Sequence, residues 1–174
     1  MAFSSIHVLY LASLFISFPF PSQGDLIDEV CNETEELKAS CLEILRNDPR
    51  SSSENLVVLS QIAIDAAIKN ATGLSPYVQS LANKVTDPQV KARILGCVVN
   101  SDDALLHITQ AKQLVATKQY GPANDKAHLA NLALSTCDNS FLLPPANEPI
   151  ELKQATNWLK ALIVIFTVIT NRFG

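Results

Sequence analysis

Residues 87–137 read DPQVKARILGCVVNSDDALLHITQAKQLVATKQYGPANDKAHLANLALSTC and contain two helical patterns joined by a short turn. In the first part of this stretch, apolar and small residues recur at spacings of four and three, as the buried stripe of a helix requires. The stripe comprises Val90, Ile94, Cys97, Ser101, Ala104, Ile108, Ala111 and Val115. Asp87 and Pro88 supply a start signal. After a break at Gly121 and Pro122 the same spacing predicts a second helix. Its stripe comprises Tyr120, Ala123, Ala127, Ala130, Leu134 and Cys137.

The positions of the four cysteines predict how they pair. Two amphipathic helices joined by a short turn pack antiparallel, and Thr117, in this turn, is the midpoint between Cys97 and Cys137. These two cysteines should therefore lie at the same height and form a disulfide. Of the three connectivities that four cysteines allow, only the sequential one has this symmetry, and it pairs Cys31 with Cys41.

The pair Cys31 and Cys41 requires a turn in the chain. Ten residues on a continuous helix span about 15 Å, whereas the Cα atoms of bridged cysteines lie within about 7 Å of each other. We expect residues 32–39 to form the bend of a small helical hairpin over residues 25–48. The break at Asn47, Asp48 and Pro49 separates this hairpin from the rest of the chain.

Two more helices are expected in the bundle. The first covers residues 53–84, and its stripe comprises Leu56, Leu59, Ala63, Ala67, Tyr77, Leu81 and Val85. Gly73 and Pro76 interrupt it, and because proline removes an interior hydrogen bond we expect a kink or a restart capped by Ser75; the alternative is two separate helices. The last stripe comprises Leu152, Ala155, Leu159, Leu162, Phe166, Ile169 and Phe173.

The fold class is therefore all-α: an antiparallel four-helix bundle over residues 49–174, preceded by the hairpin, with two disulfides. The uncharged residues 161–170 are too few to cross a membrane, and Lys160 and Arg172 flank them. A core helix is the better interpretation. The 150 residues after position 24 match one ordinary domain.

The first 24 residues have the features of a signal peptide. Residues 8–18 are apolar, Pro19 and Pro21 close this run, and small residues at Ser22 and Gly24 suit cleavage. We expect a secreted, extracellular protein whose even number of cysteines forms disulfides, with no stable membrane insertion after cleavage. Asn32 and Asn70 begin glycosylation sequons.

Charge and motifs exclude several functions. The net charge of −4 argues against nucleic acid as a partner. The sequence lacks the G-x-S-x-G, H-E-x-x-H and phosphate-loop motifs of common enzymes, so no enzymatic activity and no cofactor are expected. His107 and His128 would lie at one level, but two ligands do not make a metal site, and no metal is expected. A secreted lipid or ligand carrier remains an alternative, although the small residues of the stripes suggest closely packed helices.

The sequence resembles the plant inhibitors of pectin methylesterase and of invertase over essentially the whole mature chain. Segments that carry the resemblance are Cys31-x9-Cys41, Asp48-Pro49-Arg50-Ser51, Thr86-Asp87-Pro88, Ala111-Lys112-Gln113 before Tyr120, and Thr136-Cys137-Asp138-Asn139-Ser140-Phe141. The resemblance implies a secreted protein of the cell wall (apoplast) that inhibits another enzyme. Invertase inhibitors typically carry Pro-Lys-Phe in the loop at residues 118–124, which here lacks it. Tyr120 resembles the pectin methylesterase branch, so that enzyme is the expected partner in a 1:1 complex, and invertase is the alternative.

The resemblance also implies which residues contact the partner. Asn100, Asp103 and Thr136 match positions that face the catalytic cleft of the esterase. Val99 and Leu106 stand where acidic residues are more typical. The expected mechanism is steric: a rigid, disulfide-locked helical face covers the cleft and excludes the polysaccharide.

Overall fold

The computed structural model describes residues 25–53, 55–144 and 148–173, so the expected signal peptide lies outside the described residues. These residues form six α-helices, two short 3-10 helices and no strand. The α-helices are α1 (Leu26–Asn32), α2 (Lys38–Arg46), α3 (Leu56–Lys84), α4 (Pro88–Ala116), α5 (Tyr120–Asn139) and α6 (Ile150–Asn171), and the 3-10 helices are Glu35–Leu37 and Pro49–Ser53. The all-α class is confirmed.

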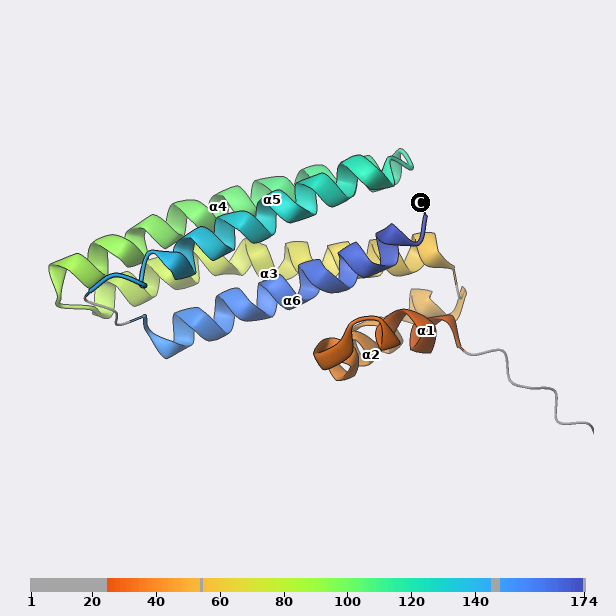
Figure 1. The fold of residues 1–174 in the computed structure, drawn as a ribbon, viewed down its shortest axis with the longest axis horizontal. Helices are drawn as coiled ribbons and strands as arrows, with labels where there is room; N and C mark the ends of the chain where they lie inside the picture. The colour runs from red at the N-terminus through yellow and green to blue at the C-terminus, as the bar shows by residue number, and fades with distance from the viewer. Residues whose placement is uncertain (1–24, 54, 145–147, 174) are drawn as a thin grey trace, which may run out of the picture.

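The four long helices form an antiparallel bundle, with α1 and α2 beside one end of it (Figure 1). Around the bundle, α3 packs on α4, α4 on α5, α5 on α6, and α6 closes the ring against α3. The pair α4 and α5 therefore lies on the opposite side of the bundle from the pair α3 and α6. The short helices α1 and α2 pack against α6 and α3, respectively.

Helices α4 and α5 carry the predicted stripes into the core. All eight residues of the α4 stripe are buried. On α5, five of the six are buried, and Tyr120 is half-buried. Asp87 caps α4, accepting hydrogen bonds from the backbone N–H groups of Gln89 (2.8 Å) and Val90 (3.1 Å). A single apolar face on each helix was enough to specify this half of the bundle.

Helix α3 corrects the expected interruption at Pro76. The restart at Ser75 is wrong, because α3 runs without a break from Leu56 to Lys84 and its cap is Asn55. Proline deprives the carbonyl four residues earlier of its donor. That residue is Thr72, and both it and Pro76 are exposed. The lost hydrogen bond therefore lies on a side of α3 that solvent can reach, where its cost is low.

An unbroken α3 also corrects the second half of its stripe. Because the helical phase is kept across Pro76, the buried residues there are Ala71, Leu74, Val78, Leu81 and Ala82. Tyr77 lies outside this stripe and is 40% exposed. Val85 follows the last helical residue and is half-buried.

Helix α6 is the one helix of the described residues that is long and apolar enough to cross a membrane. Half of its apolar stretch is buried inside the bundle, and the buried side chains include Phe166 and Ile163. This burial agrees with the interpretation as a core helix. At the start of α6, Thr156 is buried where the sequence predicted Ala155, which is half-buried.

The N-terminal hairpin is closed by a disulfide and tied to α6. Cys31 and Cys41 are bonded, with their Cα atoms 5.5 Å apart. The chain turns between α1 and α2 through the 3-10 helix Glu35–Leu37. From the end of α6, the guanidinium of Arg172 reaches the carboxylates of Glu33 (Nε to Oε1, 3.0 Å) and Glu29 (3.5 Å). The turn that follows α6 therefore ties α1 to the bundle.

Candidate partner-binding face

The three residues expected to contact a partner lie on two adjacent antiparallel helices. Asn100 and Asp103 belong to α4, and Thr136 belongs to α5. The disulfide between Cys97 and Cys137 sets the register, with Cα atoms 4.8 Å apart. Counting from this disulfide at about 1.5 Å per residue, Thr136, Asn100 and Asp103 fall within roughly 10 Å along the bundle axis.

The polar groups of these three residues differ in what they offer a partner. Asp103 is exposed, and its carboxylate forms no ion pair within the described part of the chain. Thr136 is also exposed, but its hydroxyl donates to the carbonyl of Leu132 (2.9 Å), so it can only accept from a partner. Asn100 is half-buried on the side of α4 that faces α5. Together the three side chains offer a partner hydrogen-bond acceptors, and the amide of Asn100 can also donate.

Exposed leucine and valine side chains surround this polar group. Val99 and Leu106 on α4 are 60% and 53% exposed, and Leu129 and Leu132 on α5 are 39% and 61% exposed. On α4, spacings of four and three residues place Val99, Asp103 and Leu106 on one side of the helix. On α5, spacings of three and four residues do the same for Leu129, Leu132 and Thr136. We call these six residues and Asn100 the α4–α5 face. Contiguous exposed apolar side chains commonly mark an interaction surface.

Leu129 and Leu132 are the members of this face that sequence reasoning missed. The signal was present, because both lie outside the buried stripe of α5 and keep a helical spacing with Thr136. Apolar residues outside a stripe stay exposed unless another element covers them. Here the neighbours of α5 are α4 and α6, and neither covers its outer side.

The segment beside the fourth cysteine supports the face from inside. Asp138 is half-buried and pairs with the ammonium of Lys160 on α6. It also accepts a hydrogen bond from the hydroxyl of Thr156 (3.1 Å). Asp138 is therefore committed to the contact between α5 and α6, while Thr136, two residues earlier, points outward. The disulfide and this pair hold α5 rigidly on both sides.

Two other segments of the resemblance meet far from this face. Arg50 donates to Asp48 (2.7 Å) and to Asp65 of α3 (2.9 Å), and Lys112 of α4 pairs with Asp65 (2.8 Å). Burial raises the pKa of Asp65, but the hydrogen bonds from Lys112 and Arg50 outweigh it, so the pKa lies below its usual value. This cluster ties the link between hairpin and bundle to α3 and α4, so its role is structural.

Tyr120, which suggested the esterase branch, also has a structural role. Its ring stacks on the ring of Phe173, with centroids 3.7 Å apart. The stack joins the turn between α4 and α5 to the C-terminal end of the chain. The loop expected at residues 118–124 is shorter than predicted, because Tyr120 is the first residue of α5. Tyr120 is half-buried there, so packing accounts for this residue.

The remaining candidate residues are dispersed. His107 is half-buried and His128 is exposed, and the described residues contain no group of three or more side chains placed to bind a metal ion. Asn32 is exposed at the end of α1, and Asn70 is half-buried on α3. Neither asparagine belongs to the α4–α5 face.

A rigid helical bundle that presents a mixed apolar and polar face has the form of a protein-binding module. The family described as plant invertase/pectin methylesterase inhibitor matches residues 25–167, and the chain belongs to this family. Its members are protein inhibitors of those enzymes and not enzymes themselves. An inhibitory role follows for this chain.

Known relatives agree with this assignment. A pectinesterase inhibitor of Actinidia deliciosa is 37% identical over 164 residues, which cover 94% of this chain and 88% of that protein. Pectinesterase inhibitor 2 of Arabidopsis thaliana is 26% identical over 115 residues, 66% of each chain. The crystal structure of a pectin methylesterase inhibitor from Arabidopsis thaliana shares the fold with a TM-score of 0.63, at 21% identity, over 87% of this chain and 98% of that one.

Proposed function

We propose that this chain is a secreted inhibitor of pectin methylesterase, which acts in the plant cell wall by covering the catalytic cleft of the enzyme in a 1:1 complex. The observation that carries the choice of target is the 37% identity to a pectinesterase inhibitor over nearly the whole chain. Invertase is the second candidate, because the description of the family includes both targets.

The α4–α5 face is the proposed contact surface. Its two helices are locked by the disulfide between Cys97 and Cys137, so little conformational entropy is lost when it binds. Asp103, Asn100 and Thr136 offer hydrogen bonds to polar groups that otherwise contact sugar. Four exposed aliphatic side chains gain free energy when the partner removes them from water. Binding of this kind blocks the cleft without any chemical step.

The composition of this face predicts how binding depends on salt. Where acidic residues are more typical of the family, Val99 and Leu106 are apolar. Asp103 is the only charged member of the α4–α5 face. We therefore expect affinity to change little with ionic strength, since screening acts on charges and not on apolar contacts.

The test is a parallel titration. Purified protein starting at Asp25 is added to a plant pectin methylesterase and to a plant acid invertase, and residual activity is followed at each ratio. The expected result is stoichiometric loss of esterase activity with an end point at one inhibitor per enzyme, while invertase keeps its activity. Inhibition of invertase alone would reverse the choice of target, and inhibition of neither would overturn the proposal.

A further inference from the structure

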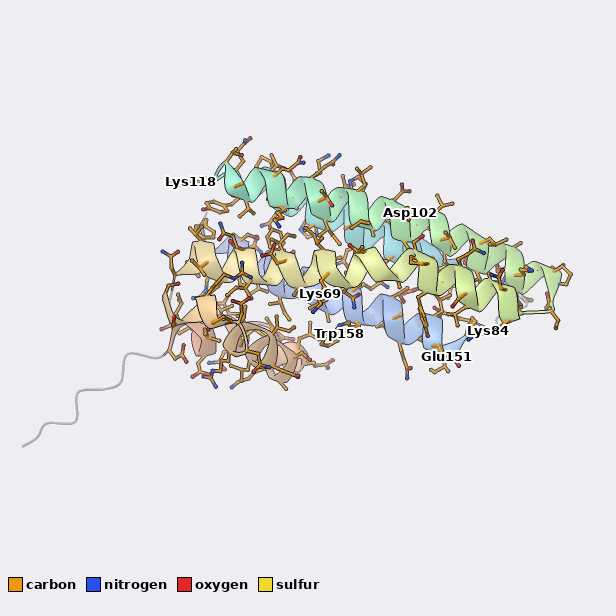
Figure 2. All side chains as sticks on the ribbon, turned by 180° about the vertical axis from the view of Figure 1, so that it is seen from behind. Lys69, Lys84, Asp102, Lys118, Glu151 and Trp158 are labelled. Carbon is orange, nitrogen blue, oxygen red and sulfur yellow. A yellow bond between two sulfur atoms is a disulfide. The ribbon has the colours of Figure 1, made fainter. Side chains whose placement is uncertain are left out.

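A groove of about 570 Å³ lies on the opposite side of the bundle from the α4–α5 face. Its walls come from α2, α3 and α6, and its lining includes Ile44, Asn70, Gly73, Tyr77 and Trp158. Figure 2 shows Lys69 of α3 and Trp158 of α6 close to the hairpin, with Asp102 of α4 on the other side of the bundle. The volume is in the range of a site that holds a small organic group.

Two aromatic side chains in this groove are incompletely covered. Tyr77 is 40% exposed and Trp158 is 41% exposed. Most of the other lining atoms are apolar, contributed by residues such as Ile44, Ala66 and Leu162. An apolar groove with exposed aromatic rings is a surface that a bound group would shield from water.

The side chain best placed to carry such a group is Asn70. It begins the sequon Asn70-Ala71-Thr72, it lines the groove, and it is only half-buried. Its amide is absent from every side-chain hydrogen bond formed among the described residues. The side chain of Asn70 is therefore partly accessible, and its amide is free of hydrogen bonds to other side chains in the described part of the chain.

The glycine one turn beyond Asn70 leaves room beside it. Gly73 lines the same groove, and a Cβ added there would meet no atom within 4 Å. Glycine inside a helix costs about 1 kcal/mol relative to alanine, and no close helix contact requires it at this position. Its absent side chain instead widens the groove next to Asn70.

We propose that Asn70 carries an N-linked glycan in the secreted protein and that the first sugar residues lie in this groove against Trp158 and Tyr77. The apolar faces of the sugar rings cover the aromatic rings, while their hydroxyl groups remain in water. Asn32 provides the contrast, because its exposed side chain at the end of α1 is not among the residues that line this groove.

The attachment reaction uses a lipid-pyrophosphate-linked oligosaccharide as the donor. A bond forms between Nδ2 of Asn70 and the anomeric carbon of the first N-acetylglucosamine, the bond from that carbon to the pyrophosphate oxygen breaks, and the lipid pyrophosphate leaves as the amide loses a proton. In folded α3 the Thr72 hydroxyl donates to the carbonyl of Ile68 (2.8 Å). The transfer therefore takes place on the nascent chain, before α3 closes.

The occupancy of Asn70 is tested by mass. The full chain is secreted from plant cells behind a leader known to work there, so the test is independent of residues 1–24 and of inhibition. Intact mass is measured for the natural sequence and for Asn70→Gln, Thr72→Ala and Thr72→Ser. One glycan should be lost in the first two variants and kept in Thr72→Ser, which preserves the sequon and guards against a folding effect. An Asn70→Gln variant whose mass differs from that of the natural sequence only by the added methylene group would overturn the proposal.

The place of the glycan is tested by fluorescence. Trp158 is the only tryptophan of the chain, so its emission reports on this groove alone. Enzymatic release of the glycan should shift the emission to longer wavelength and increase quenching by acrylamide, whereas the same treatment of Asn70→Gln should change neither. If Asn70 carries a glycan but its release leaves the emission of Trp158 unaltered, the glycan does not lie in the groove and this part of the proposal is wrong.

Discussion

Cys97 on α4 and Cys137 on α5 lie at the same height on two antiparallel helices, with their Cα atoms 4.8 Å apart. This bond joins the two helices that carry the α4–α5 face, close to Asn100 and Thr136. The other disulfide, between Cys31 and Cys41, closes only the hairpin. The two bonds therefore have different consequences for stability and for inhibition.

Removing the bond between α4 and α5 should cost more stability than removing the bond in the hairpin. By loop-closure entropy, a separation of 40 residues gives about 4 kcal/mol and a separation of 10 gives about 3 kcal/mol. Chemical denaturation of the two double Cys→Ser variants, each against the natural protein, measures the difference. An equal or larger loss for Cys31→Ser/Cys41→Ser would contradict this order.

Charge introduced into the α4–α5 face should abolish most of the inhibition. Leu132→Asp places a carboxylate on a side chain that is 61% exposed in the free protein and dehydrated in the proposed complex, so affinity should fall about 10- to 100-fold or more. The inhibition constant against pectin methylesterase is the measurement. Ile150→Asp, equally exposed at 61% but on α6, is the matched control and should inhibit normally.

Asp65 should make stability depend on acidity. Its pKa in the folded protein lies below the usual value because hydrogen bonds from Lys112 and Arg50 outweigh its burial. A lowered folded pKa gives stability that is present above about pH 4 and is lost as the pH falls through the folded pKa. Asp65→Asn should therefore lower the free energy of unfolding by about 1 to 3 kcal/mol at pH 6. This deficit should shrink below pH 3, as followed by urea denaturation across the pH range, and a constant deficit would count against the ionic origin.

Ionisation of Glu148 should lower the stability of the protein, whereas ionisation of Asp65 raises it. Its pKa is raised by burial and then by the nearby charge of Asp138, and its Oε1 is buried without a hydrogen-bond partner within the described part of the chain. A raised folded pKa means that the ionised side chain disfavours folding once the pH rises through that value. Glu148→Gln should raise the melting temperature at pH 7 and have little effect near pH 4. A gain of equal size at both values would show that charge is not the cause.

The helices α4 and α5 were predictable because one face of each contains only apolar or small residues. No competing signal interrupts the stripe from Val90 to Val115, and hence every member is buried. Pro76 led to the wrong prediction that α3 is interrupted. Pro76 lies on the exposed side of α3, so the hydrogen bond that it removes costs little. The packing of neighbouring helices along the rest of α3 stabilises the continuous helix, and residue preferences alone do not predict this packing.

The α4–α5 face was only partly predictable. Asn100, Asp103 and Thr136 came from the family resemblance. Leu129 and Leu132 were missed although both lie outside the buried stripe of α5, because this position alone does not show whether another helix covers them. Their exposure depends on which helices flank α5, a property of the assembled bundle. Tyr120 was recognised for its place in a loop, but its partner Phe173 lies 53 residues away in sequence.

Two contacts beyond the end of α6 join parts of the chain that are far apart in sequence. Phe173 stacks on Tyr120, and Arg172 binds Glu29 and Glu33 in the first helix region. Both contacts close long loops of chain, and loop closure costs entropy that grows with loop length. The docking of the hairpin and of the turn between α4 and α5 should therefore be a late event in folding, after the local helices have formed.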